Sequence, residues 1–409
     1  MGLTGLLARA GAVRPHVLVA AMPGGAAVRL AAEDQLRRRG WPAALSPADA
    51  DVLLVAGAPA ADIATAVEAT WAAIPAPRVR ALVTSPGEIA AALDAARAGL
   101  ATGTRQWLPA GEGSVQPDGH GSGADGPGGS HDAHGTAGHH DMDDMDIEMP
   151  AGLPMAERGE DRDGLKLDQL HVRLGPVLPD WPAGLVVRLT LQGDVVQHAE
   201  TAVTGLAGAG SFWTEPWRRA AAGEPVTTGV AARRRAGAHL DSLGRLLGLA
   251  DWDDAAAAAR RLRDDTLGGT PASVLAPAVR RLAVRVARSR VLAWSTRGAG
   301  VLRPGEAAAA GVTGPARRAG GDVTDRYRAW CGELAGLPAA FDDGSRLDPA
   351  ALEPPRGRLD GTQPPSASLL AVLPQLLTGA EFAAARLTIA SLDPDLDELS
   401  AHVGAGRDR

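Results

Sequence analysis

The sequence predicts an α/β N-terminal unit with a parallel sheet, followed by a larger, mainly α-helical unit that begins with a β-hairpin. From His16 to Gly99, short apolar runs alternate with helical stretches, whereas the chain after Trp217 has mainly helical periodicity. Strands joined by helices of about 10–15 residues favour a parallel sheet covered on both faces. The 409 residues suffice for two or three domains.

The first unit is predicted to contain three buried strands, each followed by a helix. The strands are Val17–Met22, Ala50–Ala56 and Val79–Thr84, and the helices are Ala26–Arg39, Ala60–Ala73 and Pro86–Ala98. Gly40 marks the end of the first helix, and the run Pro75-Ala76-Pro77 breaks the second.

The second unit is predicted to open with a hairpin. Its arms are His171–Arg173 and Leu185–Val196, and they flank a proline-rich turn at residues 175–182. Helices are expected at Ala231–Leu249, Trp252–Thr266, Ser273–Ser295 and Asp322–Ala335, with a shorter C-terminal set around Ser368–Leu377.

The composition changes sharply between Pro109 and Pro150, where Gly, His, Asp, Ser and Met replace the large apolar residues. We therefore expect a disordered linker at 109–151 between an α/β domain at 14–108 and a second domain at 152–409. The segment from Asp118 to Met149 holds eight acidic residues and no Lys or Arg. Since the formal net charge of the chain is −7, the other residues together are nearly neutral. A neutral body with one Tyr and three Phe argues against nucleic-acid binding.

The sequence has no run of about 18 apolar residues, which argues against an integral membrane protein. The stretch from Met1 to Ala20 is interrupted by Arg9, Arg14 and Pro15, so no export signal is recognised and the expected location is the cytoplasm.

Cys331 is the single cysteine of the chain. An intrachain disulfide and an all-cysteine zinc or iron–sulfur site are therefore excluded, because each needs several thiols. Cys331 lies in a predicted helix, where a small packing residue is expected. His239 and His402 have no evident partners, and core or surface roles are expected for them.

Two motifs of the first unit resemble the cluster-bearing small subunit shared by respiratory complex I and the nickel–iron hydrogenases. They are Ser46-Pro-x-x-Ala50-Asp51, with the apolar strand that runs on to Gly57, and Ile74-Pro-x-Pro77-Arg78-Val79. The resemblance implies a flavodoxin-like parallel sheet and, in the family, a 4Fe–4S cluster on four cysteines.

Three blocks of the second unit resemble the large, quinone-site subunit of the same enzymes. They are His171-Val-Arg-Leu-Gly175-Pro176-x-x-Pro179 with the strand from Gly184 to Asp194, Gly311-Val-Thr-Gly314-Pro315-x-x-Arg318-x-x-Gly321-x-x-x-Asp325, and Leu373-Pro374 followed by Ile389-Ala-Ser-Leu-Asp393-Pro394. Their order is that of the family, over most of residues 160–400. The chain thus resembles a fusion of the two subunits, which tethers natural partners.

The redox ligands that this resemblance implies are missing. Residues 1–110 contain no cysteine, and the family's positions near Ala20–Gly25 and Thr84–Gly87 hold small or polar residues, so no iron–sulfur cluster is expected. Hydrogenase large subunits carry two cysteines after an Asp-Pro pair, where this chain has Asp395 and Glu398. Hard oxygen donors do not suit a nickel–iron centre, which is therefore not expected.

The large subunit of complex I binds quinone beside the histidine of a G-P-x-H-P turn, and Leu178 stands at that position here. Leucine cannot donate a hydrogen bond or a proton. A bound quinone is kept as an alternative, and no catalytic residue is assigned. The family-pocket candidates are Gly175, Pro176, Leu178, Pro179, Gly314, Pro315, Arg318 and Asp325. For the last four, a turn and a buried ion pair are favoured over a substrate cavity.

Two clusters are candidate metal sites. His131, His134, His139 and His140 would suit zinc, nickel or copper, but without a fixed spacing the favoured interpretation is a soluble spacer. Asp393, Asp395, Asp397 and Glu398 would suit a hard cation, but acids near a C-terminus more often form a solvated face, which is the prediction here.

A retained framework without its ligands predicts a scaffold, assembly or regulatory component of a membrane-associated complex I-like or hydrogenase-like system. Its partners would be the other subunits, and it would contact the inner face of the cell membrane only through them. One alternative is a true NADH–quinone oxidoreductase-type subunit that keeps a quinone pocket while neighbouring chains carry the electrons. Another is a metal-handling protein that uses the His-rich linker.

Overall fold

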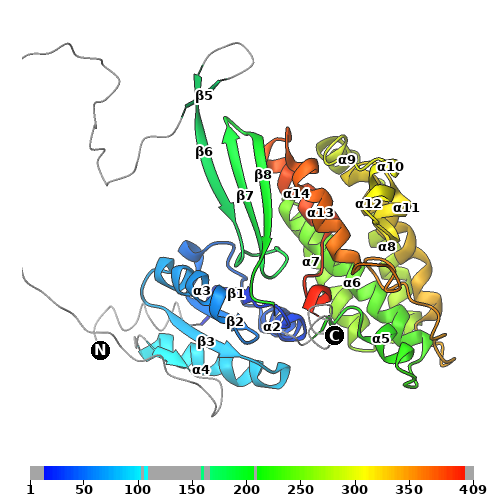
Figure 1. The fold of residues 1–409 in the computed structure, drawn as a ribbon. Helices are drawn as coiled ribbons and strands as arrows, with labels where there is room; N and C mark the ends of the chain where they lie inside the picture. The colour runs from blue at the N-terminus through cyan, green and yellow to red at the C-terminus, as the bar shows by residue number, and fades with distance from the viewer. Residues whose placement is uncertain (1–12, 103–105, 109–157, 161–165, 207–209, 401–409) are drawn as a thin grey trace, which may run out of the picture.

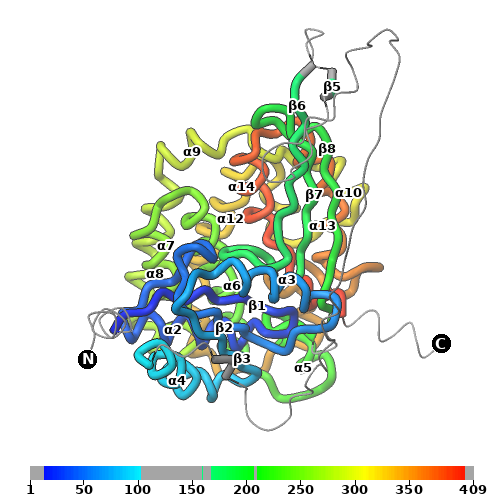
Figure 2. Tube along the Cα trace, turned by 90° about the vertical axis from the view of Figure 1, so that its left-hand side faces the viewer, coloured from blue at the N-terminus to red at the C-terminus, as the bar shows by residue number. Residues whose placement is uncertain are grey.

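The computed structural model describes residues 13–102, 106–108, 158–160, 166–206 and 210–400. The predicted linker at 109–151 and His402 lie outside these ranges, as do the linker histidines His131, His134, His139 and His140. In Figure 1 the blue α/β unit lies below and to the left of the helical unit, with the long strands of the second sheet above it. Figure 2 shows the same vertical arrangement from the side.

The first unit contains a parallel sheet in the order β1-β2-β3-β4. Its strands are β1 (Val17–Ala21), β2 (Val52–Ala56), β3 (Val79–Val83) and β4 (Gln106–Leu108), and its helices are α2 (Ala26–Arg39), α3 (Ala61–Ala73) and α4 (Ile89–Thr102). Short 3-10 turns, η1 (Pro47–Asp49) and η2 (Pro86–Glu88), precede β2 and α4. The predicted strands and helices are confirmed to within a few residues, whereas β4 was not predicted.

Both faces of this sheet are covered, as predicted. Leu54 points to the face on which α2 and α4 pack through Val28 and Leu93. Its neighbour Leu53 points to the other face, where α3 packs through Ile63 and Val67. Strands β1 and β2 are covered on both faces and consist of apolar residues without alternation, and this is why they could be recognised.

The outer edge of β1 has a further parallel pairing, with Ala43. The amide of Val17 donates to the carbonyl oxygen of Pro42, and the amide of Ala44 donates to that of Val17. The chain therefore crosses through α2 to the edge of β1 opposite β2, and then returns to form β2. With Ala43 counted as the second strand, the order is the 2-1-3-4-5 of flavodoxin-like sheets.

The second unit opens with an antiparallel sheet of β5 (Arg158–Glu160), β6 (Lys166–Leu174), β7 (Leu185–Gln192) and β8 (Val195–Val203), paired in that order. Strands β6 and β7 confirm the predicted hairpin. The predicted end of the second arm at Val196 was wrong, because Gly193 has a φ of +60° and reverses the chain before Val195. Such a tight two-residue turn favours glycine.

The remaining described elements of the second unit are helices. They are α5 (Glu215–Ala221), α6 (Thr228–Leu249), α7 (Asp253–Leu267), α8 (Ala272–Ala287), α9 (Arg290–Thr296), α10 (Pro304–Ala309), α11 (Gly314–Ala319), α12 (Val323–Gly336), the 3-10 turn η3 (Leu337–Ala340), α13 (Pro365–Leu377) and α14 (Phe382–Leu392). The predicted single helix Ser273–Ser295 was wrong, because it is interrupted between α8 and α9. There the Ser289 hydroxyl accepts a hydrogen bond from the Leu292 amide and caps a new helix.

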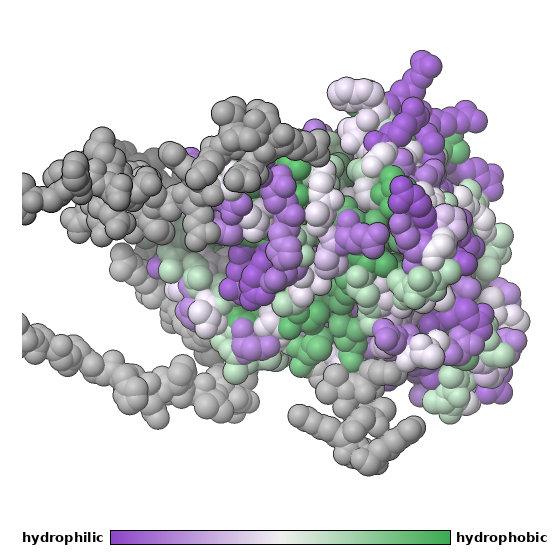
Figure 3. All heavy atoms as spheres, turned by 45° about the horizontal axis from the view of Figure 1, so that its top comes forward, coloured by the Kyte–Doolittle hydropathy of each residue, from purple (hydrophilic) through white to green (hydrophobic). Residues whose placement is uncertain are grey.

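The main core of the second unit lies among α6, α7, α8 and α12. Leu240, Leu243, Val279 and Tyr327 are fully buried there. Cys331 is part of the same cluster, and burial raises the pKa of its thiol to about 12. Its predicted role as a packing residue is confirmed. On the face drawn in Figure 3, hydrophilic side chains predominate and apolar ones appear in patches between them.

None of the helices in the described ranges combines the length and the apolar character needed to cross a bilayer.

Gly175 offers a test of the turn between β6 and β7. Its φ is +77°, and a Cβ at this position would lie 2.0 Å from the carbonyl oxygen of Leu185. The same oxygen accepts a hydrogen bond of 2.7 Å from the indole nitrogen of Trp181. We expect Gly175→Ala to lower the free energy of unfolding by more than about 1 kcal/mol, measured by urea denaturation.

The matched control is Gly332→Ala. Gly332 is exposed within α12, and a Cβ there would meet no atom within 4 Å. An alanine should stabilise the helix by about 0.5–1 kcal/mol. Equal effects of the two substitutions would contradict this account of the turn.

Candidate functional site

The carboxyl ends of β1 and β2 face the helical unit. In open parallel sheets this is the edge outside which ligands bind. The loop from Met22 to Gly25 leaves β1 here and passes close to the end of β2, since a Cβ on Gly25 would lie 2.2 Å from the carbonyl oxygen of Ala56. Its two glycines leave room for the helical unit, whose Asp397 accepts a hydrogen bond from the Gly24 amide.

Helix α2 contacts the helical unit through charged residues four positions apart, namely Arg29, Glu33 and Arg37. The Arg29 guanidinium donates to both carboxylate oxygens of Asp241 on α6, at 3.1 and 2.7 Å. Arg263 on α7 donates to Glu33 at 2.6 Å, and Arg37 forms an ion pair of 3.2 Å with Asp264. The spacing places all three side chains on one face of α2.

Asp241 is the centre of this buried network, with an exposed fraction of 1%. It also pairs with Arg263 at 2.6 Å and with Arg245 at 3.2 Å. Burial alone would raise the pKa of its carboxyl, but Arg29, Arg245 and Arg263 outweigh that effect and hold the pKa well below its usual range. Burial would likewise raise the pKa of Glu33, but Arg29 and Arg263 outweigh it and lower this pKa to about 2.

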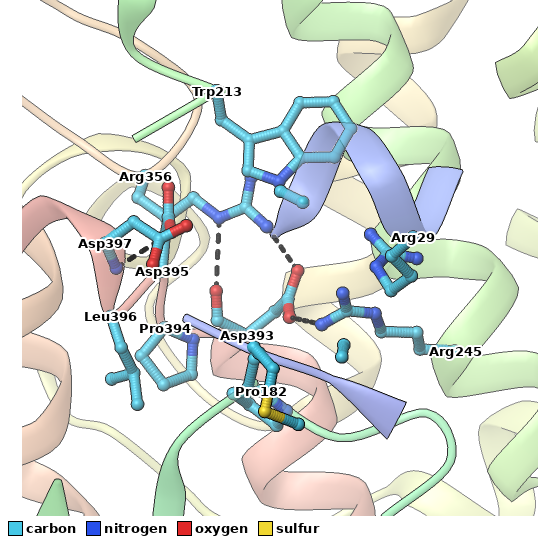
Figure 4. Close-up of a pocket in the computed structure, with 14 residues that line it drawn as sticks. Arg29, Pro182, Trp213, Arg245, Arg356, Asp393, Pro394, Asp395, Leu396 and Asp397 are labelled. Carbon is cyan, nitrogen blue, oxygen red and sulfur yellow. Dashed lines mark hydrogen bonds and ion pairs between the residues drawn. The ribbon is translucent and has the colours of Figure 1, made fainter. Parts of the chain in front are cut away.

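A second group of charges surrounds Asp393, which ends α14 with a positive φ of 39°. Its carboxylate accepts hydrogen bonds from the Ser242 hydroxyl at 2.7 Å and from Arg245 at 3.0 Å. Arg356 also pairs with this carboxylate, and its Nε donates to the Asp393 carbonyl oxygen at 3.1 Å. Figure 4 shows Arg245 and Arg356 on either side of Asp393. Arg245 thus links both groups of charges.

The acids that follow Asp393 are mostly buried, so the predicted solvated face is wrong. Asp397 and Glu398 are only 7% and 5% exposed, because the chain after α14 runs between the two units. Asp397 accepts a hydrogen bond of 2.6 Å from the Gly24 amide across the interface, and Glu398 accepts one of 3.0 Å from Ser366. Burial and the nearby Asp395 raise the pKa of Asp397 to about 7 and that of Glu398 to about 8.

These residues do not fit the redox groups of the resembled family. The cavity between the loop after β1 and residues 393–397 has a volume of about 40 Å³, and its walls hold arginine and carboxylate groups but no thiol. Iron–sulfur and nickel–iron centres need soft thiolate donors. Within the described ranges, no three side chains of His, Cys, Asp and Glu are grouped so that they could hold a metal ion.

A larger cavity of about 300 Å³ lies nearby, between β1, α2 and α7. Leu178 and Pro179, two of the predicted pocket residues, line it together with Trp41 and Trp181. Asp180 also lies in its wall, where it accepts bonds of 2.7 and 2.8 Å from Arg260. Burial raises the pKa of Asp180, and Arg260 only partly opposes this. The site therefore combines an apolar wall with a few polar groups, as ligand pockets do.

The other predicted pocket residues lie elsewhere. Pro315 borders a separate cavity of about 20 Å³, next to His239 and Trp330. Arg318 pairs with Glu333 and Glu353 at a half-exposed position, so the predicted buried pair with Asp325 is wrong.

Arg318 and Asp325 do not pair because Asp325 has another role at the start of α12. Asp325 caps the helix by accepting a hydrogen bond from the Asp322 amide, and its carboxylate is thereby engaged at the start of α12. The predicted turn is present, since Gly314 has a φ of +67°. Gly175 and Pro176 belong to the turn beside the larger cavity but do not line it.

His239 lies in the core, which is one of the two positions predicted for it. It is 1% exposed, its Nε2 lies 3.0 Å from a carboxylate oxygen of Glu333, and its ring stacks on Trp330. Burial lowers the pKa of His239 despite this carboxylate.

The network on α2 was missed at the sequence level. The four-residue spacing of Arg29, Glu33 and Arg37 was visible, but so regular a charge pattern usually indicates a solvated helix face. Their partners Asp241 and Arg263 lie more than 200 positions away.

No family model and no curated protein matches the chain. Solved structures do match, among them a chain of the membrane-bound sulfane sulfur reductase, an archaeal respiratory membrane complex. That match has 16% sequence identity and a TM-score of 0.39, and it covers 56% of this chain and 98% of the other. The protein is thus distantly similar in structure to a component of a respiratory membrane complex.

Proposed function

We propose that the protein is a structural subunit of a membrane-associated respiratory oxidoreductase complex, and that it contributes shape and contacts without a redox centre of its own. One observation carries this proposal. The crevice at the carboxyl ends of the sheet, where the resembled subunits would hold their redox ligands, is closed by ion pairs and carboxylates around Asp241 and Asp393. Such groups lock two units together and offer no soft donor to a metal cluster.

The buried network also supports a scaffold role on energetic grounds. A buried charge that loses its partner destabilises a protein strongly, so paired charges at an interface define one relative position of the two units. Arg29 pairs with Asp241, and Glu33 pairs with Arg263, in this way across the interface. A fixed arrangement of both units would present a constant surface to other subunits.

Co-purification tests the proposal. The full chain, tagged and expressed at its natural level, is purified from gently solubilised native membranes. We expect respiratory-complex subunits to accompany it in a fixed ratio. Recovery of the chain alone, or only from the fraction free of membranes, would contradict the proposed function. The matched variants are Asp241→Ala, which should lose these subunits, and Asp94→Ala at an exposed pair, which should retain them.

The larger cavity favours a second candidate, a subunit that binds a quinone while neighbouring chains carry the electrons. Its volume of about 300 Å³ and its mixed apolar and polar walls suit a substituted aromatic ring. Leu178 is 40% exposed and faces this space. The ring would pack against Leu178 and Trp41.

A binding measurement with a short-chain quinone analogue tests this candidate. We expect Leu178→Trp to fill part of the cavity and to weaken binding by roughly tenfold or more. The control is Leu170→Trp, at a position on β6 that is 58% exposed and outside the cavity lining. Binding that is absent at saturating analogue, or equal in both variants, rules the second candidate out.

A further inference from the structure

Helix α9 carries two large apolar side chains on its outer side. Val291 is 77% exposed and Trp294 is 83% exposed. They are three positions apart and therefore adjacent on the helix, whereas Leu292, Ala293 and Thr296 on the other side are buried. Single exposed apolar residues are common, but here a highly exposed Val and a highly exposed Trp lie next to each other, and no part of the described chain covers them. We call this pair the apolar anchor.

The sequence around this anchor is strongly basic. Residues 268–305 contain seven arginines and no acidic residue. The arginines are Arg280, Arg281, Arg285, Arg288, Arg290, Arg297 and Arg303, and all of them are exposed. Within the described residues only Arg285 and Arg303 have acidic partners, Asp254 and Glu306. Five guanidinium groups are therefore available to an external anion.

Helix α8 continues the pattern. Its exposed residues Val274, Pro277, Arg281, Val284 and Arg288 follow each other at alternating intervals of three and four, so they form one line along the helix. The opposite side, with Leu275, Val279 and Val286, is buried in the core. We call the exposed residues of α8 and α9 the α8–α9 surface.

Both views place α9 at the upper end of the helical unit, away from the α/β unit (Figures 1 and 2). The α9 end of this surface thus lies away from the interface, and no residue of α8 or α9 lines either cavity of the candidate site. It is a separate feature that substitutions can test without disturbing that site.

We infer that the α8–α9 surface docks directly on a lipid bilayer that contains anionic headgroups. Arginines gain about 1 kcal/mol each near such a surface, and tryptophan favours the level of the headgroups. Val291 and Trp294 would enter the boundary of the acyl chains while Arg290 and Arg297 contact phosphate groups. This goes beyond the proposed function, which names no membrane-contacting surface on this chain, and it differs from the sequence-based expectation that only partners contact the membrane.

The acidic segment 118–149 of the same chain is the competing occupant. It matches the charge, but Gly, His, Asp and Ser make up most of it. A bilayer matches both properties of the α8–α9 surface, the charge and the apolar anchor, and is therefore the occupant we propose.

Flotation with vesicles tests the inference on the full chain. One vesicle type contains equal amounts of phosphatidylglycerol and phosphatidylcholine, and the other contains phosphatidylcholine alone. We expect binding to the anionic vesicles that weakens with added salt, and little binding to the neutral ones. Trp294→Ser should weaken binding roughly tenfold, and Arg290→Gln roughly fivefold. These positions are exposed, so both variants should fold.

The controls change the same residue types elsewhere. Leu170→Ser replaces an exposed apolar residue of β6, and Arg97→Gln replaces an exposed arginine of α4. Both should bind as the wild type does. The inference is overturned if the wild type does not float with anionic vesicles at low salt, as expected if the acidic segment or an acidic protein covers the surface. Equal binding of Trp294→Ser and the wild type would overturn it as well.

Discussion

Asp241→Ala is expected to lower the free energy of unfolding by about 3–5 kcal/mol. The substitution leaves Arg29, Arg245 and Arg263 close together without the carboxylate that they share. Asp241 is only 1% exposed, so water cannot replace it at little cost. Urea denaturation followed by circular dichroism gives the change, and the α/β unit should separate from the helical unit at lower urea than in the wild type.

The control for this prediction is Asp94→Ala. Asp94 pairs with Arg39 at 2.6 Å, but its side chain is 57% exposed, and pairs of this kind contribute about 0–1 kcal/mol. If Asp241→Ala cost no more than Asp94→Ala, the buried network would not be what holds the two units together. Asp241→Asn keeps the size of the side chain and should still cost more than the control.

The second large effect is a loss of stability at alkaline pH. The folded state holds the pKa of Asp397 at about 7 and that of Glu398 at about 8, far above the values of unfolded chains. A carboxyl with a raised pKa keeps its proton in the folded state while the unfolded state has lost it. Stability therefore falls as the pH rises towards the folded pKa.

We expect the free energy of unfolding to fall by about 2 kcal/mol between pH 6.5 and 8, mainly through Glu398. Below pH 6.5, other groups change the free energy of unfolding in the opposite direction. The pKa of His239 is lowered in the folded state, so this residue adds stability as the pH rises towards 6.5. The pKa of about 2 for Glu33 and Glu333 adds stability in the same way as the pH rises towards about 4.5. Above pH 6.5 the buried carboxyls should dominate.

Urea denaturation at several pH values checks this prediction. Glu398→Gln cannot ionise and should show a flatter profile, so that it becomes more stable than the wild type at pH 8. A profile in the variant as steep as in the wild type would show that other groups cause the loss. Glu306→Gln, at a partly exposed capping position on α10, is the matched control and should keep the wild-type slope.

The strands of the first unit could be predicted because their burial is a local property of the sequence. Val52–Ala56 is apolar throughout, as a strand covered on both faces must be, and no distant residue is needed to explain it. The break between α8 and α9 could not be predicted in this way. The residues on both sides keep a helical pattern, and the cap depends on how Ser289 turns.

The candidate site was predicted only in part, because its chemistry depends on contacts between distant segments. Acids near a C-terminus are usually solvated, and nothing near Asp397 in the sequence indicates that the Gly24 amide binds it. Leu178 and Pro179 were found from a motif, and they do line the larger cavity. Asp180 and Arg260 were missed, since their pairing joins a turn and a helix 80 residues apart.

Metal analysis of the full chain, purified under strict anaerobiosis and combined with electron paramagnetic resonance, tests the central claim most directly. The claim is the one proposed above, that the crevice at the carboxyl ends of the sheet holds arginines and carboxylates and no redox centre. The account predicts iron and nickel far below one atom per chain and no cluster signal before or after reduction. Stoichiometric iron or nickel with such a signal would contradict it.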